Sequence, residues 1–323
     1  MSVSTTFYPG AQNNSLAPDL ALLSSDSVFF YVHSHLLLGA SENGFRSMIP
    51  APPSKHKDQG PVLSIQETSS ILNIILHTIY DMSCAHYSPP FEILVAAVNR
   101  LPTYGVRPKS RIAPSTPLFT LLLSHAPLFP MELYALASYF DLYDLAVSTS
   151  SHLLSFSLAT LTDDMAERIG PVYLKRLFFL HFGRSDALKR VLLPPPHPHA
   201  PTPWCDFTEQ KKLTRAWALA SAYLAWDARP GTCSLSKANL YAHAGLLDLS
   251  TSTMESALSP LGEHLSCDLC RSALKDRIKN LIVQWSVVKA RISIPLDFRI
   301  PTHNYVLADD LSFRHIIGGP VPL

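Results

Sequence analysis

Cys267 and Cys270, in the sequence Cys-Asp-Leu-Cys, have the spacing in this chain that is most typical of metal chemistry. Two thiolates separated by two residues can bind one tetrahedral ion at a turn or at the start of a helix. A structural zinc site needs two more ligands, and the second half of the chain offers His197, His199, Cys205, Cys233 and His264. Their separations match no zinc finger, zinc ribbon or RING pattern. We therefore expect that Cys267 and Cys270 do not form a complete zinc site.

A reactive cysteine pair is a second interpretation of the same spacing. The N-terminus of a helix lowers the pKa of a thiol and so favours the nucleophilic thiolate. A third interpretation is that both residues are buried or incidental cysteines, and the helical pattern around them favours this one. On that basis the sequence predicts no metal ligand and no cofactor.

Sequence patterns of catalysis are absent. The chain contains no G-x-S-x-G nucleophile elbow, no G-x-G-x-x-G or G-x-x-x-x-G-K phosphate loop and no H-E-x-x-H motif. His33 has no nucleophile or second ligand at a defined spacing, so we expect a buried, structural histidine. Asp163 and Asp164 fit the first turn of a helix, where carboxylates complement the helix dipole. The sequence predicts no catalytic residue and no enzyme.

Composition and charge limit the classes of partner. The chain has 323 residues, of which 16% are charged and 47% hydrophobic, and its formal net charge is +1. This length favours two or more domains, and the charge gives no reason to expect nucleic acid or an anionic membrane as a partner. The first residues lack the pattern of a signal peptide, and prolines, His125 and Glu132 interrupt the longest apolar region, residues 118–140. Five scattered cysteines suit a reducing compartment, so we expect an intracellular protein, cytoplasmic or nuclear.

The apolar pattern between residues 19 and 40 changes from a period of two to a helical period. Residues 28–32 alternate as in a strand, and residues 19–23 can pair with them as a hairpin. Helical spacing begins at Ser34, which can serve as the N-cap. Ser69 or Ser70 can cap a further helix, with the buried stripe Leu72, Ile75, Leu76 and Ile79. Pro90 opens another, with the apolar face Phe91, Leu94, Val95 and Val98.

Taken together, these residues resemble the BTB/POZ domain, most closely its fungal, basidiomycete-type branch. The shared features are an Asp-led strand at Asp19, a Ser-Asp turn at Ser25 and Asp26, the F-x-V-H strand at residues 30–33 and a stretched S-x-x-F at residues 41–45. The likeness continues through residues 61–65, 79–81 and 91–106, and more weakly through 131–146, so that it covers about half the chain. The order and spacing of the motifs carry the resemblance. It implies a small sheet capped by helices.

The predicted fold class is α+β and mostly helical, with this BTB/POZ-like unit followed by an all-helical C-terminal region. We expect a disordered tail at residues 1–17, the BTB/POZ-like domain at 18–124 and a helical extension at 125–193. The extension includes a helix pair at 131–140 and 142–154 and a longer helix at 171–193. Six prolines in residues 194–203 predict an extended linker. A second helical region with a tryptophan-rich core follows at 204–292, with helices near 213–224, 238–247 and 267–291, and an irregular tail at 293–323.

The resemblance implies a non-enzymatic protein that acts through protein–protein interaction, by self-association as a homodimer or by recruitment of a partner, as a scaffold or adaptor does. The first strand and first helix would supply the contact, for which the candidates are Leu20, Leu22, Leu37 and Leu38, unless these belong to the ordinary core. The alternative is a zinc-containing, nucleic-acid-associated regulator that uses Cys267 and Cys270. An enzyme is a more distant alternative, and no membrane partner is expected.

The resemblance also predicts poor binding to the cullin-type ubiquitin-ligase scaffold that many BTB proteins serve. Such adaptors carry a hydrophobic-x-Glu motif, whereas Ile49 is followed here by prolines at 50, 52 and 53 and by no acidic residue before Asp58. The carboxylate is missing, and the prolines fix an extended backbone where the loop must adapt to its partner. In a pulldown with purified cullin scaffold we expect no stoichiometric complex at low micromolar concentration. A complex that is lost on replacing Ile49 would contradict this expectation.

Overall fold

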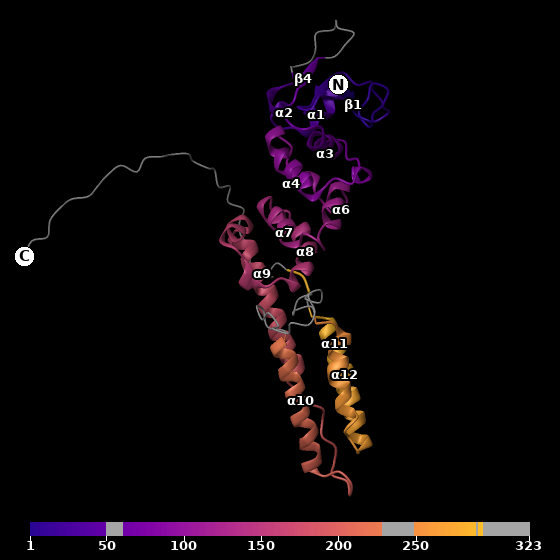
Figure 1. The fold of residues 1–323 in the computed structure, drawn as a ribbon, viewed down its shortest axis with the longest axis vertical. Helices are drawn as coiled ribbons and strands as arrows, with labels where there is room; N and C mark the ends of the chain where they lie inside the picture. The colour runs from indigo at the N-terminus through magenta and orange to yellow at the C-terminus, as the bar shows by residue number, and fades with distance from the viewer. Residues whose placement is uncertain (50–60, 228–248, 289, 293–323) are drawn as a thin grey trace, which may run out of the picture. The chain divides into compact units, whose positions relative to one another are not determined.

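The computed structural model describes residues 1–49, 61–227, 249–288 and 290–292, all of which belong to one structural unit. The described chain is mostly helical, with a small sheet near the N-terminus, as the sequence predicts (Figure 1). Between residues 125 and 292 the described residues form helices and no strand, apart from one isolated bridge between Thr202 and Cys205. The expected helix at 238–247 and the expected tail at 293–323 lie outside the described residues.

The sheet has four strands in the order β1-β3-β2-β4. β2 (Leu20–Leu23) and β3 (Val28–Val32) form the predicted antiparallel hairpin, in which Leu22 lies opposite Phe30. β4 (Val62–Ser64) pairs in parallel with β2, and β1 (Ser2–Val3) pairs in parallel with β3. A parallel neighbour requires a crossover connection, and the helices α1 (Ser34–Ala40) and α2 (Gly44–Ser47) lie within it.

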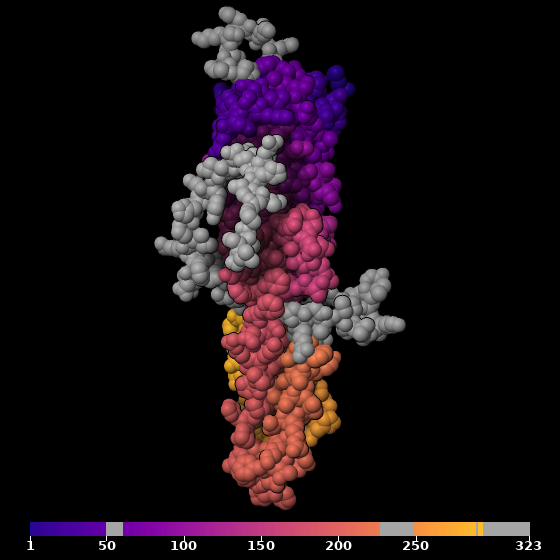
Figure 2. All heavy atoms as spheres, turned by 90° about the vertical axis from the view of Figure 1, so that its left-hand side faces the viewer, coloured from indigo at the N-terminus to yellow at the C-terminus, as the bar shows by residue number. Residues whose placement is uncertain are grey.

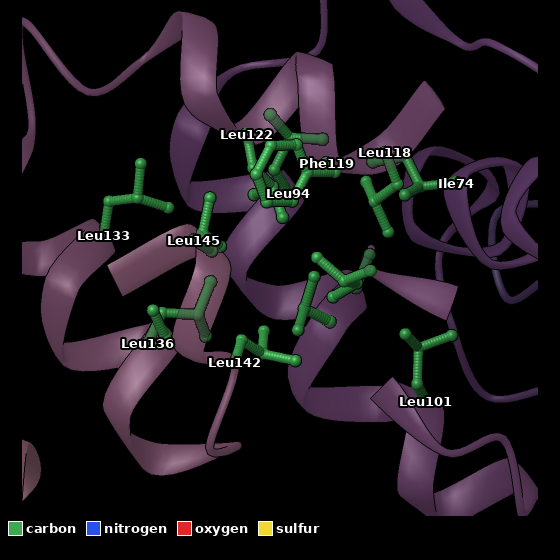
Figure 3. Close-up of a cluster of buried hydrophobic side chains, with 14 of the residues drawn as sticks. Ile74, Leu94, Leu101, Leu118, Phe119, Leu122, Leu133, Leu136, Leu142 and Leu145 are labelled. Atoms are coloured by element: carbon green, nitrogen blue, oxygen red, sulfur yellow. The ribbon is translucent and has the colours of Figure 1, made fainter. Parts of the chain in front are cut away.

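The first hydrophobic cluster joins the sheet to the helices that follow it. These helices are α3 (Ser69–Ile79), α4 (Phe91–Arg100), α5 (Pro108–Arg111), α6 (Pro117–Ser124), α7 (Pro130–Tyr139) and α8 (Tyr143–Ser150). The predicted stripe on α3 is confirmed, because all four of its residues are buried. Leu94 of α4, Leu122 of α6 and Leu145 of α8 belong to this one cluster (Figure 3). The expected boundary at residue 124 therefore does not separate two cores.

The prediction of a disordered tail at residues 1–17 is wrong. Ser2 and Val3 pair with β3, and the Phe7 side chain is fully buried. The Phe7 ring packs against Phe30 of β3 and against His77 and Tyr80 at the end of α3. Burying an aromatic side chain of this kind stabilises a fold by roughly 1.5–3 kcal/mol, which offsets part of the entropy lost on ordering the segment.

Helix α9 (Asp163–Leu192) connects the first cluster to a second one. Its N-cap is Thr162, and Asp163 and Asp164 lie in its first turn, as predicted. The helix is interrupted at Gly170, where φ is +73°. Beyond that point Leu177 and Leu180 belong to the first cluster, whereas Leu188 and Leu192 belong to the second.

The second cluster is formed by the end of α9 with α10 (Phe207–Asp227), α11 (Thr251–Leu258) and α12 (Asp268–Ser286). Figure 2 shows α9 and α10 side by side. Two tryptophans, Trp217 and Trp285, lie in the cluster, but Trp204 and Trp226 are exposed, so the predicted aromatic core contains half of the tryptophans.

The proline-rich residues 194–203 do not act as a spacer between separate domains. The Pro194 carbonyl accepts a hydrogen bond of 2.8 Å from Nε of Arg277 in α12, and Pro196 is buried. Carbonyl groups at the end of a helix have no N–H partner within the helix. Arg277 of α12 supplies donors to such carbonyls, and this holds the segment against α12.

Two carboxylates of the hairpin cap the helices that cover it. Asp19 accepts hydrogen bonds from the backbone N–H and the hydroxyl of Ser34, at the start of α1. Asp26 does the same for Ser69 at the start of α3, at 2.8 and 2.6 Å. Each carboxylate satisfies an orphan donor of a helix N-terminus and places negative charge at the positive end of its dipole.

We expect Asp26→Ala to lower the free energy of unfolding by about 1 kcal/mol, the usual cost of losing an N-cap. Burial alone would raise the pKa of Asp26, but hydrogen bonds from Ser24 and Ser69 outweigh it and lower the pKa below the ordinary 3.8. The stabilisation is therefore complete above pH 3.8 and is lost as the pH falls through the lowered folded value. Urea denaturation of the wild type and the variant near neutral pH measures the loss of stability, and the same comparison below pH 3.8 measures how far the difference shrinks. Asp276→Ala, an exposed change in α12, is the control and is expected to be neutral.

Candidate functional site: a cysteine–histidine cluster

His33 occupies a structural position, as the sequence predicts. Its side chain is buried at the junction of β3 and α1, and its Nε2 lies 2.8 Å from the Leu16 carbonyl. The Tyr80 hydroxyl accepts a hydrogen bond from the His33 backbone N–H and lies 2.8 Å from Nδ1. Nε2 must donate to the carbonyl, so Nδ1 accepts from the tyrosine hydroxyl, and this network fixes the tautomer. No free ring nitrogen is left for acid–base chemistry.

Three of the four leucines predicted as contact residues belong to the core. Leu20, Leu22 and Leu37 are 3%, 0% and 0% exposed, and all three belong to the first cluster. Leu38 is 40% exposed. The interaction surface expected from the first strand and helix is therefore reduced to the outer face of α1.

The Cys-Asp-Leu-Cys sequence begins α12. Cys267 is the N-cap residue with an extended backbone, and Cys270 lies in the first helical turn with 5% of its surface exposed. This conformation places both sulfurs on the same side of the helix start. The arrangement agrees with the general expectation for two thiolates separated by two residues.

Two further side chains that could serve as ligands come from the segment between α9 and α10. Thr202 and Cys205 exchange backbone hydrogen bonds of 2.9 and 3.1 Å, and this tight turn directs Cys205 inward. Sγ of Cys205 lies 3.7 Å from Sγ of Cys270. His199 Nε2 lies 3.4 Å from Sγ of Cys267 and 3.3 Å from Sγ of Cys270. All ligand atoms of His199, Cys205, Cys267 and Cys270 lie within 4.8 Å of one another.

The expectation of an incomplete zinc site rested on spacing along the sequence, and the fold brings His199 and Cys205 beside Cys267 and Cys270 in spite of that spacing. His199 and Cys205 are separated from the Cys-Asp-Leu-Cys sequence by more than 60 positions. Sequence spacing recognises zinc sites whose ligand pairs lie on familiar short motifs, whereas here helix packing brings the pairs together. Of the remaining candidates, His197 and His264 are exposed, and Cys233 lies outside the described residues.

The hydrogen bonds around His199 suit a metal ligand. Its Nδ1 lies 2.7 Å from the Ala200 carbonyl, so Nδ1 carries the proton and the lone pair of Nε2 faces the sulfurs. Nε2 of Gln210, a buried residue of α10, donates to the His199 carbonyl at 3.1 Å, and its side chain also hydrogen-bonds to Cys205. Metal-bound histidines commonly donate their other ring N–H to a backbone carbonyl, as His199 does here.

The cysteines differ in their tendency to ionise. Hydrogen bonding from the backbone N–H of Cys270 lowers the pKa of Cys267 to about 7, whereas burial raises the pKa of Cys270 to about 12. Burial also raises the pKa of Cys205. Three clustered thiols cannot all ionise without a cation between them, because neighbouring thiolates repel one another. A divalent cation reverses this balance, since a coordinated thiol is deprotonated.

Among the described residues, this cluster is the only group of three or more His, Cys, Asp or Glu side chains placed so that they could share one metal ion. No helix in the described part of the chain combines the length and apolar character needed to cross a membrane. Comparison with protein-family models, curated proteins and solved structures finds no match to this chain.

We expect Tyr80→Phe to lower the free energy of unfolding by about 1–3 kcal/mol. The change deletes one oxygen and leaves the buried His33 amide and Nδ1 without their partner, which costs the desolvation of those groups. Urea denaturation of the full chain measures the loss. Tyr8→Phe, at a tyrosine that is 45% exposed, serves as the matched control. Equal stabilities for the two variants would show that the network contributes nothing measurable.

Proposed function

We propose that this chain is a non-enzymatic protein-interaction protein whose N-terminal unit is a domain of the BTB/POZ type. The main support for the proposal is structural: the residues that define the sequence resemblance also join the hairpin to its helices. Asp19 caps α1, Asp26 caps α3 and His33 ties β3 to the end of α3. These positions join the hairpin to its helices, which is the role expected of residues that define a fold.

The remaining motifs support the same proposal. The Ser41 hydroxyl accepts a hydrogen bond from the Phe45 N–H and donates to the Tyr104 carbonyl at 2.6 Å. Gly105 has φ of +72°, and a Cβ at this position would lie 2.5 Å from Asn43 Oδ1, so glycine alone fits without rearrangement. The end of α1 and residues 101–105 therefore close against each other. The order of hairpin, helices, parallel strand and further helices agrees with the small sheet capped by helices that the resemblance implies.

The outer face of α1 is the surface proposed for partner contact. Leu38 projects from it with 40% of its side chain exposed, and Leu16, which is 59% exposed, lies beside the start of α1 because its carbonyl bonds to His33. Burial of such apolar side chains by a partner removes their surface from water and so favours association. The partner is a second copy of this chain or another protein.

A cullin-type scaffold remains a doubtful partner. In cullin adaptors the hydrophobic-x-Glu motif supplies an apolar anchor, and Ile49 is the residue at the corresponding place here. The Ile49 side chain is half-buried against the first cluster. To act as the anchor, the Ile49 side chain would have to leave the first cluster and enter a pocket of the partner. The prolines that follow, and Asp58, lie outside the described residues.

A nucleic-acid-associated zinc regulator is the second candidate. The cysteine–histidine cluster supports the metal-binding part of this hypothesis. Nucleic-acid binding lacks support, because acidic side chains near the cluster pair with the basic ones and compensate their charge. Lys212 pairs with Glu209 on α10, and Arg271 pairs with Asp268 on α12. Phosphate recognition requires a basic surface of largely uncompensated charge.

The proposed surface is tested by Leu38→Glu in the tagged full chain, with copies carrying a second tag expressed beside it. We expect the partner proteins of the wild type, including second copies of this chain, to bind the variant at least about tenfold more weakly. This factor corresponds to roughly 1.4 kcal/mol of binding free energy. The control is Leu128→Glu, which places the same charge at a leucine that is 76% exposed between α6 and α7. Quantitative mass spectrometry of the recovered proteins measures the ratio.

Two results would count against the proposal. Recovery of the same partners by Leu38→Glu would exclude the α1 face. Absence of any specifically bound protein, together with a monomeric wild type in analytical ultracentrifugation, would exclude the interaction function itself.

A further inference from the structure

We propose that His199, Cys205, Cys267 and Cys270 bind one structural zinc ion, and that the second hydrophobic cluster requires this ion to fold. The inference is independent of the interaction function, because the cluster lies in a different part of the chain from α1. It rests on the distances between the ligand atoms, on their chemical type and on the segments that they connect.

Three of the six distances between the ligand atoms are close to the edges of a zinc-centred tetrahedron, and all six are at most 4.8 Å. With Zn–S near 2.3 Å and Zn–N near 2.0–2.1 Å, sulfur atoms lie about 3.8 Å apart and sulfur and nitrogen about 3.6 Å apart. The observed Cys205–Cys270 sulfur separation is 3.7 Å, and the two nitrogen–sulfur separations are 3.4 and 3.3 Å. The four atoms therefore converge closely enough for one ion to draw them into tetrahedral coordination.

A disulfide, a group of hydrogen-bonded thiols and a calcium or magnesium site each fit the cluster less well than zinc does. A disulfide requires sulfurs about 2.05 Å apart, and Cys205, Cys267 and Cys270 are free. Hydrogen bonds alone would give little reason to gather three sulfurs, because a thiol is a weak donor and a weak acceptor. Calcium and magnesium prefer oxygen ligands, which the cluster does not offer, whereas thiolate and imidazole together suit zinc.

The chemistry of the donor set assigns a structural role. Three sulfurs and one imidazole complete the coordination of a tetrahedral ion, so no position is left for a water molecule or a substrate. Two helix N-termini face the cluster, since Cys267 is the N-cap of α12 and Cys205 precedes Asp206, whose carboxylate caps α10. The positive ends of both helix dipoles favour the thiolate charge of the ligands.

The ion would connect segments that are far apart in the sequence. His199 and Cys205 lie between α9 and α10, and Cys267 and Cys270 begin α12, so one ion closes a loop of more than 60 residues. Clips that close long loops remove the most entropy from the unfolded chain. The cluster also holds α10 and α12 in the positions from which Trp217 and Arg277 reach the end of α9.

The distribution of tryptophans makes this dependence measurable. All four tryptophans of the chain, Trp204, Trp217, Trp226 and Trp285, follow residue 203, so tryptophan emission reports on the C-terminal helices alone. The remaining described cysteine, Cys84, is 4% exposed in the first cluster and reports on the N-terminal unit.

Metal stoichiometry is the first test. The full chain, purified under reducing conditions with zinc chloride, should contain one zinc ion per chain by elemental mass spectrometry. His199→Asn, Cys205→Ser and Cys270→Ser should each retain less than a tenth of that amount. The matched controls are His197→Asn, two residues from His199 and exposed, and Cys233→Ser, and both should retain full occupancy. Gln210→Ala should weaken binding about tenfold in competition with a chromogenic chelator, because the ligands lose a side chain that orients them.

Reversible removal of zinc from the wild type is the second test, and it remains informative if a variant fails to fold. Chelation should shift tryptophan emission to the red and expose Cys205, Cys267 and Cys270 to alkylation while Cys84 stays protected, and added zinc should reverse both changes. Cobalt(II) in place of zinc should give the intense visible bands of a tetrahedral thiolate site. The proposal is wrong if the wild type holds far less than one ion, if His199→Asn retains as much as His197→Asn, or if chelation leaves emission and alkylation unchanged.

Discussion

The end of α9 is the point on which the second half of the structure depends. Its last carbonyls have no helical partners, and side chains from two other helices satisfy them. The Leu192 carbonyl accepts hydrogen bonds from Nε1 of Trp217 and from the Ser221 hydroxyl, at 2.9 and 3.3 Å. Arg277 of α12 donates to the Val191 and Pro194 carbonyls and lies over the Trp217 ring. A helix end buried in an apolar cluster would otherwise carry unpaired acceptors at a cost of about 1–3 kcal/mol each.

The same helix couples the two clusters. Leu177 and Leu180 pack in the first and Leu188 in the second, and between them Arg184 stacks on Trp285 of α12 at 4.2 Å. The chain then returns towards its first half, because the Ile292 N–H donates to the Ser150 hydroxyl at the end of α8. A change that loosens α12 therefore reaches the N-terminal unit through α9 and through this return contact, so the two halves are linked by packing as well as by sequence.

The predictions that succeeded depend on local pattern, and those that failed depend on contacts between distant residues. The alternation at residues 28–32 and the stripe on α3 fix the hairpin and a helix, since each is a short-range property of the chain. Phe7 looked like part of a polar tail because its burial needs Tyr80 and His77, which lie far along the sequence. Leu37 and Leu38 are adjacent and chemically identical, and only the packing of α1 decides that one is core and the other exposed.

The proline-rich segment shows how the same residues support two interpretations. Prolines stop a helix and favour an extended chain, which predicts a spacer, but they also restrict the backbone before folding occurs. The conformational entropy lost when such a segment is ordered is therefore smaller than for an ordinary loop. His199 lies between Pro198 and Pro201, and Cys205 follows Pro203 by two positions, so both proposed ligands are carried on backbone that is already stiff. A segment of this composition can place two ligands against a helix start at low entropic cost, and the hydrogen bonds from Arg277 and Gln210 then select that position.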